Sequence, residues 1–204
     1  MKQVLSTEIA ELICTRISHD LVGGIGTISN ALELWEDDPD DVLSLKPLLE
    51  NSSQTLSARM KFFRIAFGLG NAAPKEIEEL NKIIENYLAT VGNSKTPIVM
   101  HSDVQNVSYY KILALCVMAL ADVFVRGGEI KASETDDSLT FEATSEFELS
   151  ALKLENIKNA IEGKIPDENP ALLAPVIYLS AFLSGAGVEM KLEYTDKEAV
   201  LSIR

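Results

Sequence analysis

The alternation of apolar and polar positions in the first 70 residues predicts two long helices. Between Leu5 and Trp35, apolar residues recur mostly at steps of three and four, the spacing that puts them on one face of a helix. The stretch 36–41 is acidic, contains a proline and has no apolar residue, so it predicts a solvated turn. A second helix is expected from about Pro47 to Phe67, ended by the glycine-containing run 68–71.

A two-helix hairpin cannot enclose its own apolar face. Two such hairpins close into a four-helix bundle when two copies of a chain pair, so the pattern favours a homodimer. The alternative is that the apolar face packs on the rest of the same chain.

Beyond residue 72 the pattern changes to a mixture of shorter helices and strands. Helices are expected at 74–88, 107–126, 149–161 and 170–183. Strands are expected at 97–100, 129–135, 138–144, 188–194 and 199–203. This order predicts a helix layer on one face of a mixed sheet. The whole chain is therefore expected to be α+β, with a helical hairpin domain at 1–72 and an α/β sandwich domain at 73–204.

The charge balance narrows the classes of partner. The chain has 18 Lys and Arg against 31 Asp and Glu, a formal net charge of −13. That excess of acid argues against a nucleic-acid binder, whose affinity comes from neutralising phosphates, and against docking on an anionic membrane. We therefore expect neither nucleic acid nor membrane as a partner.

Several features favour a cytoplasmic protein. The most apolar stretch, 112–125, is interrupted by Asp122 and falls short of the ~20 residues that a membrane span needs. Glu8 and Glu11 occupy the place where a signal peptide would need an apolar run. Cys14 and Cys116 have no partners at metal-ligand spacing, as expected for a reduced compartment.

His19 is the candidate nucleophile. It lies two residues from both Ile17 and Leu21, which places it on the side of the helix away from the apolar face. Residues on its own side are mostly small or polar: Thr15, Arg16, Val22, Gly23, Gly26, Thr27 and Asn30. An exposed imidazole is largely neutral at pH 7, so one ring nitrogen keeps its lone pair. His101, the other histidine, has no ligand-spaced partner, which favours a structural or surface role.

Three glycines follow His19 within the predicted helix. Gly23, Gly24 and Gly26 each cost up to about 1 kcal/mol relative to alanine in a helix interior. This loss of helix stability suggests that a partner approaches the helix backbone closely. The alternative is that the glycines separate two shorter helices.

Charged neighbours suggest an anionic ligand at His19. The carboxylate of Asp20 could orient the ring or accept its Nδ1 proton. Antiparallel pairing of the hairpin would place His19 level with residues 60–64, so Arg16, Arg59 and Arg64 could flank a phosphoryl group. The alternative is that these are ordinary solvated arginines.

Two motifs resemble one family of signalling proteins. The run 16–26, Arg-Ile-Ser-His-Asp-Leu-Val-Gly-Gly-Ile-Gly, continues to Asn-Ala-Leu-Glu-Leu at 30–34. This segment resembles the phospho-acceptor helix of the alphaproteobacterial histidine phosphotransferases of the ChpT type. The run 121–128, Ala-Asp-Val-Phe-Val-Arg-Gly-Gly, resembles the helix end that precedes the first hairpin of the same family.

The resemblance implies a dimeric helical hairpin followed by a degenerate histidine-kinase ATP-binding domain. It also implies that His19 relays phosphoryl groups between receiver domains, those of a hybrid histidine kinase and of response regulators. Asp20 would orient the ring, Arg16 and Arg64 would ease charge build-up, and the glycine-lined side would admit the receiver's loops. No cofactor is expected in the chain itself, because the receivers would bring the Mg²⁺.

The sequence departs from an active kinase in its second half. The position at which a kinase holds Mg²⁺ with an asparagine falls at Ala119. No Asp-x-Gly-x-Gly follows the first hairpin, and no glycine-rich loop precedes the helix at Pro170. Without these groups phosphoryl transfer from ATP lacks its electrostatic clamp, so autokinase activity is not expected. Two alternatives stay open: a non-catalytic dimeric scaffold that docks receivers or kinases, and a true ATP-using kinase.

Overall fold

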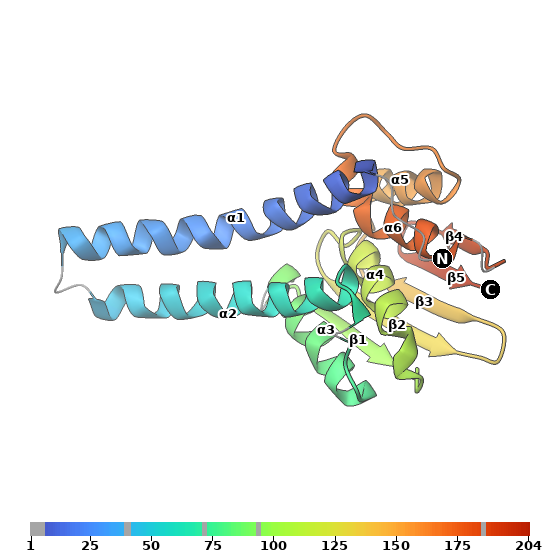
Figure 1. Ribbon diagram of the computed structural model, residues 1–204, viewed down its shortest axis with the longest axis horizontal. Coiled ribbons are helices and arrows are strands. Elements are labelled where there is room, and N and C mark those ends of the chain that lie inside the picture. The colour runs from blue at the N-terminus through green and yellow to red at the C-terminus, as the bar shows by residue number, and fades with distance from the viewer. Residues whose placement is uncertain (1–6, 39–41, 71–72, 93–94, 185–186) are drawn as a thin grey trace.

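A computed structural model shows a helical hairpin projecting from a lobe built on one sheet (Figure 1). It describes residues 7–38, 42–70, 73–92, 95–184 and 187–204. The mixed α+β fold predicted from the sequence is confirmed. None of the helices in these ranges is long and apolar enough to cross a membrane.

The hairpin consists of α1 (Thr7–Asp37) and α2 (Val42–Ala66). Gly23, Gly24 and Gly26 all lie inside the unbroken α1, so the alternative of two shorter helices is wrong. A Cβ on Gly24 would stand 2.9 Å from Leu56 Cδ2, so this glycine lets the two helices pack closely. Of the predicted turn at 36–41, Asp37 ends α1 and positions 39–41 lie outside the described residues.

The second helix begins earlier than the proline signal predicts. α2 starts at Val42, which places Pro47 inside the helix. Pro47 lacks the N–H that would bond the carbonyl of Leu43, but Leu43 is 81% exposed, so water can solvate that carbonyl. The helix ends near the predicted glycine, where the Gly68 N–H donates to the Arg64 carbonyl.

One mixed five-stranded sheet forms the base of the lobe. Its strands are β1 (Ile98–Ser102), β2 (Gly128–Glu134), β3 (Leu139–Thr144), β4 (Met190–Tyr194) and β5 (Glu198–Ile203). They lie in the order β1-β2-β3-β5-β4, with β1 parallel to β2 and every other pair antiparallel. Both predicted hairpins are present, β2–β3 and β4–β5.

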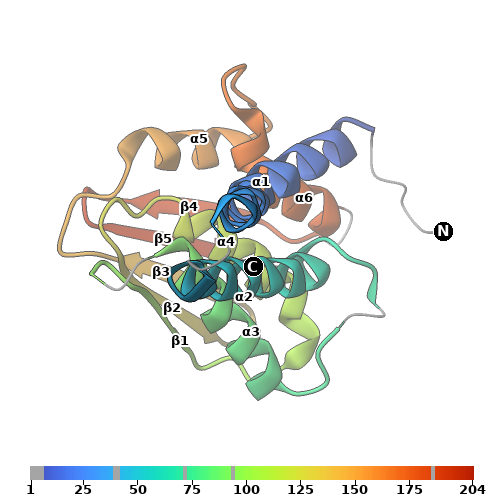
Figure 2. The ribbon, with the colours of Figure 1, turned by 90° about the vertical axis from the view of Figure 1, so that its left-hand side faces the viewer.

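The remaining helices cover one face of the sheet (Figure 2). They are α3 (Ile77–Val91), η3 (Val107–Tyr109), α4 (Tyr110–Ala121), α5 (Ala151–Ile161), η4 (Pro170–Leu173) and α6 (Ala174–Leu183). The expectation that the helix starting at 107 continues to 126 is wrong, because α4 ends at Ala121. The carbonyls of Asp122 and Val123 accept hydrogen bonds from Lys153 Nζ and from the Ser150 N–H instead of continuing the helix.

The hydrophobic core lies between the sheet and this helix layer, and α2 contributes to it. Residues on the covered face alternate along the strands, as Ile130 and Ala132 do in β2. Phe62, Phe63 and Ile65 of α2 belong to the same buried cluster, and the Phe62 ring stacks on Tyr87 of α3 with centroids 3.7 Å apart. The base of the hairpin is therefore anchored in the core of the lobe.

Candidate functional site

His19 is presented to solvent on α1, as predicted. Its side chain is 75% exposed, and its Nδ1 lies 3.2 Å from Asp20 Oδ1. A carboxylate can only accept, so in this contact Nδ1 is the donor and carries the proton. The Nε2 lone pair is then the group available to an incoming electrophile.

Arg16 does not lie on the outer side of α1. Its side chain is 4% exposed and faces the lobe. Nε donates to Asp20 Oδ2 at 2.9 Å, while Nη1 and Nη2 donate to the two carboxylate oxygens of Asp122 at 2.6 and 3.1 Å. Nη1 also reaches the Leu172 carbonyl at 3.3 Å. The expectation that Arg16 flanks a phosphoryl group is wrong, because its guanidinium is buried and engaged by carboxylates.

Arg59 is also committed to contacts within the chain. Its Nη1 donates to the Asp20 main-chain carbonyl, Nη2 to the Thr90 carbonyl at 3.0 Å, and Nε to Thr90 Oγ1 at 3.1 Å. The guanidinium thus joins α1, α2 and α3 and does not form part of an open docking surface. The expectation that Arg59 binds a partner is corrected on this ground. Arg64, in the last turn of α2, is exposed, so its expected contact with a partner stays a prediction.

The side of α1 around His19 is open. Positions three, four, seven and eleven residues further along share that side, namely Val22, Gly23, Gly26 and Asn30. A Cβ placed on Gly23 or Gly26 would meet nothing within 4 Å, so no part of the described chain requires glycine there for lack of room. Thr27 borders this side and turns its hydroxyl to the Gly23 carbonyl at 2.9 Å.

Asp122 was not identified as part of the site from the sequence. The available signal was a single carboxylate interrupting an otherwise apolar stretch, which suggests an engaged side chain but does not name the partner. In the structure it follows the last residue of α4 and pairs with Arg16, which is 106 positions away.

The electrostatics of this cluster keep Arg16 charged. Burial lowers the pKa of Arg16, but the charge of Asp122, the hydrogen bond to Asp122 and the charge of Asp20 outweigh burial, so the pKa lies above its ordinary value. Burial together with Asp122 raises the pKa of the nearby Tyr87 hydroxyl, which therefore stays neutral.

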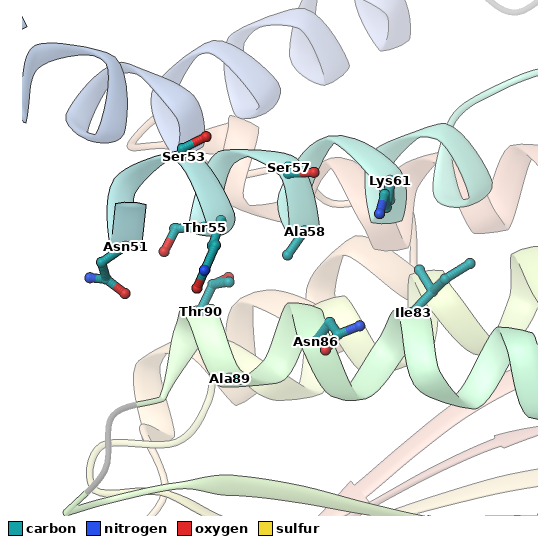
Figure 3. Close-up of a pocket in the computed structure, with 11 residues that line it drawn as sticks. Asn51, Ser53, Thr55, Ser57, Ala58, Lys61, Ile83, Asn86, Ala89 and Thr90 are labelled. Atoms are coloured by element: carbon teal, nitrogen blue, oxygen red, sulfur yellow. The ribbon is translucent and has the colours of Figure 1, made fainter. Parts of the chain in front are cut away.

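His19 is not among the residues that line two cavities of this chain. One of about 560 Å³ lies between α2 and α3 and is lined by polar side chains of both, including Asn51 and Asn86 (Figure 3). Another, of about 570 Å³, lies between α5 and the segment 166–173, with Ala119 and Asp122 in its wall. Among the described residues, no group of three or more His, Cys, Asp or Glu side chains could hold a metal ion.

The site thus consists of an exposed histidine on a helical hairpin, beside a carboxylate, and the hairpin is joined to an α/β lobe. No family model matches the chain. Over 71 residues it is 38% identical to the protein phosphotransferase ChpT of Brucella abortus (strain 2308), and the aligned part covers 35% of this chain. The match spans about a third, 34%, of that relative's length.

One solved structure shows the same fold. A structure described as a bacterial phosphotransferase superposes with a TM-score of 0.76 at 21% identity, covering 99% of this chain and 98% of that chain. A histidine kinase domain from Erythrobacter litoralis reaches a TM-score of only 0.42 at 10% identity, covering 93% of this chain and 91% of that chain. The predicted resemblance to ChpT-type histidine phosphotransferases is confirmed.

Proposed function

We propose that this chain is a histidine phosphotransferase that relays a phosphoryl group between receiver-domain aspartates through a phosphohistidine at His19. The observation that carries the proposal is the exposed imidazole whose Nδ1 is paired with Asp20 on an open, glycine-lined side of α1. The name of the Brucella relative supports the same class of activity.

The transfer needs little from this chain beyond an oriented nucleophile. The Nε2 lone pair attacks the phosphorus of an aspartyl phosphate; a nitrogen–phosphorus bond forms, and the phosphorus–oxygen bond breaks to release the aspartate carboxylate. The ring becomes cationic, and its Nδ1 proton remains hydrogen-bonded to Asp20. In the second transfer a carboxylate oxygen of another receiver attacks phosphorus, and the nitrogen–phosphorus bond electrons return to Nε2. Positioning and the receiver's own Mg²⁺ supply most of the catalysis.

The receiver would dock on the open side of α1. Val22, Gly23, Gly26, Thr27 and Asn30 form this docking side around His19, and the glycines let the receiver's loops reach the helix backbone. Of the three arginines expected near His19, Arg64 is the one that could meet an anionic group of the partner. The partners would be receiver domains of a hybrid histidine kinase and of response regulators, in the cytoplasm.

A homodimer through the hairpin is part of the proposal. Ile25 and Leu32 are 55% and 43% exposed on α1, and Leu48 is 41% exposed on α2. Exposed apolar side chains gathered on two adjacent helices favour an interface. Residues 1–72 would then serve as the dimerisation and phosphotransfer domain, and 73–204 as a degenerate kinase-type domain attached to it.

Phosphoryl transfer to the purified protein tests the proposal. A receiver labelled in advance, with free ATP removed, should pass an acid-labile, alkali-stable label to the wild type and none to His19→Ala. His101→Ala is the matched control, because His101 is exposed on the sheet and is the other histidine of the chain. This control should keep the label.

Retained labelling of folded His19→Ala would reject His19 as the acceptor. Absence of label on the wild type from several receivers that bind it would favour the scaffold instead, and a scaffold should also tolerate His19→Gln.

A further inference from the structure

A continuous line of hydrogen bonds joins His19 to the sheet lobe. It runs from His19 Nδ1 to Asp20 at 3.2 Å, from Asp20 to Arg16 at 2.9 Å, and from Arg16 to both carboxylate oxygens of Asp122 at 2.6 and 3.1 Å. Arg16, His19 and Asp20 lie within about one turn of α1, whereas Asp122 lies just after α4. These hydrogen bonds thus connect the acceptor ring to a residue from the other part of the fold.

The Arg16 guanidinium bonds two carboxylates, besides its contact with the Leu172 carbonyl. Asp122 accepts from two of its nitrogens in a forked pair, and Asp20 accepts from the third. If Asp122 lost its charge, the buried guanidinium would keep one ionised partner and would turn more of its donors to Asp20. That movement would draw Asp20 away from His19, so the Nδ1 proton would lose its acceptor.

Asp122 also contributes to the net charge of the cluster that is linked to the ring. Arg16 lies beside Asp20, the Arg59 guanidinium bonds the Asp20 carbonyl, and Lys153 bonds the Asp122 carbonyl from an exposed position. Three cations therefore lie beside Asp20, which faces the ring, and Asp122, which is linked to it through Arg16. Removing the Asp122 charge makes these surroundings one unit more positive, which opposes the cationic ring formed during transfer.

We propose that Asp122 is a positioning residue for phosphoryl transfer: through Arg16 it holds Asp20 so that His19 keeps its proton on Nδ1 and presents Nε2. This inference rests on the proposed function of His19. The competing explanation is that the Arg16–Asp122 pair only fastens α1 to the lobe. Both explanations predict a loss of stability on mutation, so stability cannot separate them.

The ring tautomer separates the two explanations. In protein labelled with ¹⁵N-histidine, His19 and His101 give two sets of ring signals, and the exposed His101 beside Glu129 serves as an internal reference. At a pH where the rings are neutral, wild-type His19 should carry its proton mainly on Nδ1. In Asp122→Asn the population should shift toward Nε2–H, as it should in Asp20→Ala. The rate of transfer from a labelled receiver should fall by about tenfold, the lower end of what losing a carboxylate behind a functional histidine causes.

The matched control is Glu155→Gln. Glu155 accepts a hydrogen bond from the Tyr194 hydroxyl at 2.6 Å, so this variant also weakens a carboxylate contact of the lobe, but one without a link to His19. Its tautomer and transfer rate should match those of the wild type. If Asp122→Asn does not fold, Arg16→Lys replaces it, because lysine keeps the charge but cannot fork between two carboxylates.

A folded Asp122→Asn with the wild-type tautomer would overturn the proposal and leave Asp122 as a tether. The tautomer is read without any receiver, so this outcome is distinct from failure of the proposed function. If no receiver labels the wild type while the tautomer shifts as expected, His19 positioning by Asp122 stands and the relay is what fails.

Discussion

The three glycines of α1 differ in what surrounds them, which gives a test at the scale of single residues. Gly23 and Gly26 have open space where a Cβ would lie, whereas Gly24 faces Leu56. Gly23→Ala and Gly26→Ala should each raise the free energy of unfolding by about 0.5–1 kcal/mol, since alanine favours the helix. Gly24→Ala should not, because Leu56 must move to make room. Thermal melts at one protein concentration measure this order.

A larger substitution at one of these glycines tests the docking side of α1. Gly23→Leu should retain the fold but slow transfer from a receiver, since a large side chain would stand beside His19 on the open side of α1. Equal stabilisation by all three alanines would contradict the packing role of Gly24.

The exposed position of His19 could be predicted from the helical period, and the nearness of Asp20 from its adjacency to His19 in sequence. Arg16 and Arg59 could not be placed in this way. Arg16 is turned inward by Asp122, and Arg59 by Thr90 and the Asp20 carbonyl. These partners lie on other elements, and the pattern of α1 or α2 contains no information about them. A buried arginine beside an apolar stripe was therefore mistaken for an exposed one.

On the scale of elements, the exposed apolar side of the hairpin determines how two copies would meet. Ile25→Glu combined with Leu32→Glu should convert the proposed dimer to a monomer. Two apolar side chains withdrawn from an interface cost about 3 kcal/mol or more, which weakens association over a hundredfold. Sedimentation velocity across a concentration series measures the effect.

Val99→Glu is the control for that experiment. Val99 is 45% exposed on the uncovered face of the sheet, away from the hairpin, so its replacement should leave association unchanged. A wild type that is monomeric at high concentration would contradict the four-helix bundle.

The sequence predicted which segments form helices and strands, but not where every helix begins and ends. Periodicity and turn residues located both β-hairpins and every helix of the lobe. The end of α4 was not predicted, because Lys153 and Ser150 bond the chain after Ala121. The start of α2 was not predicted, because Pro47 is tolerated inside the helix. Such ends are decided by partners distant in sequence or by solvent, which local pattern cannot represent.

For the molecule as a whole, the cavity beside α5 bears on nucleotide binding. Its wall contains Ala119 together with Asp122, Asp167 and Glu168, against one cation, Lys153. An acidic wall of this kind disfavours a triphosphate. Titration calorimetry with Mg-ATP should therefore detect no binding tighter than about 1 mM. Binding of Mg-ATP with a micromolar dissociation constant would support the alternative that the chain is an ATP-using kinase.

The anchoring of α2 in the lobe has a consequence for how such a chain can change over time. Phe62 and Phe63 are shared between the acceptor hairpin and the core beneath the sheet, so neither part keeps its interior when the other is replaced. Gene shuffling exchanges segments that have their own hydrophobic core, whereas this hairpin shares its core with the lobe. The chain would therefore acquire new partners through single substitutions on the open side of α1, and not through replacement of the whole hairpin.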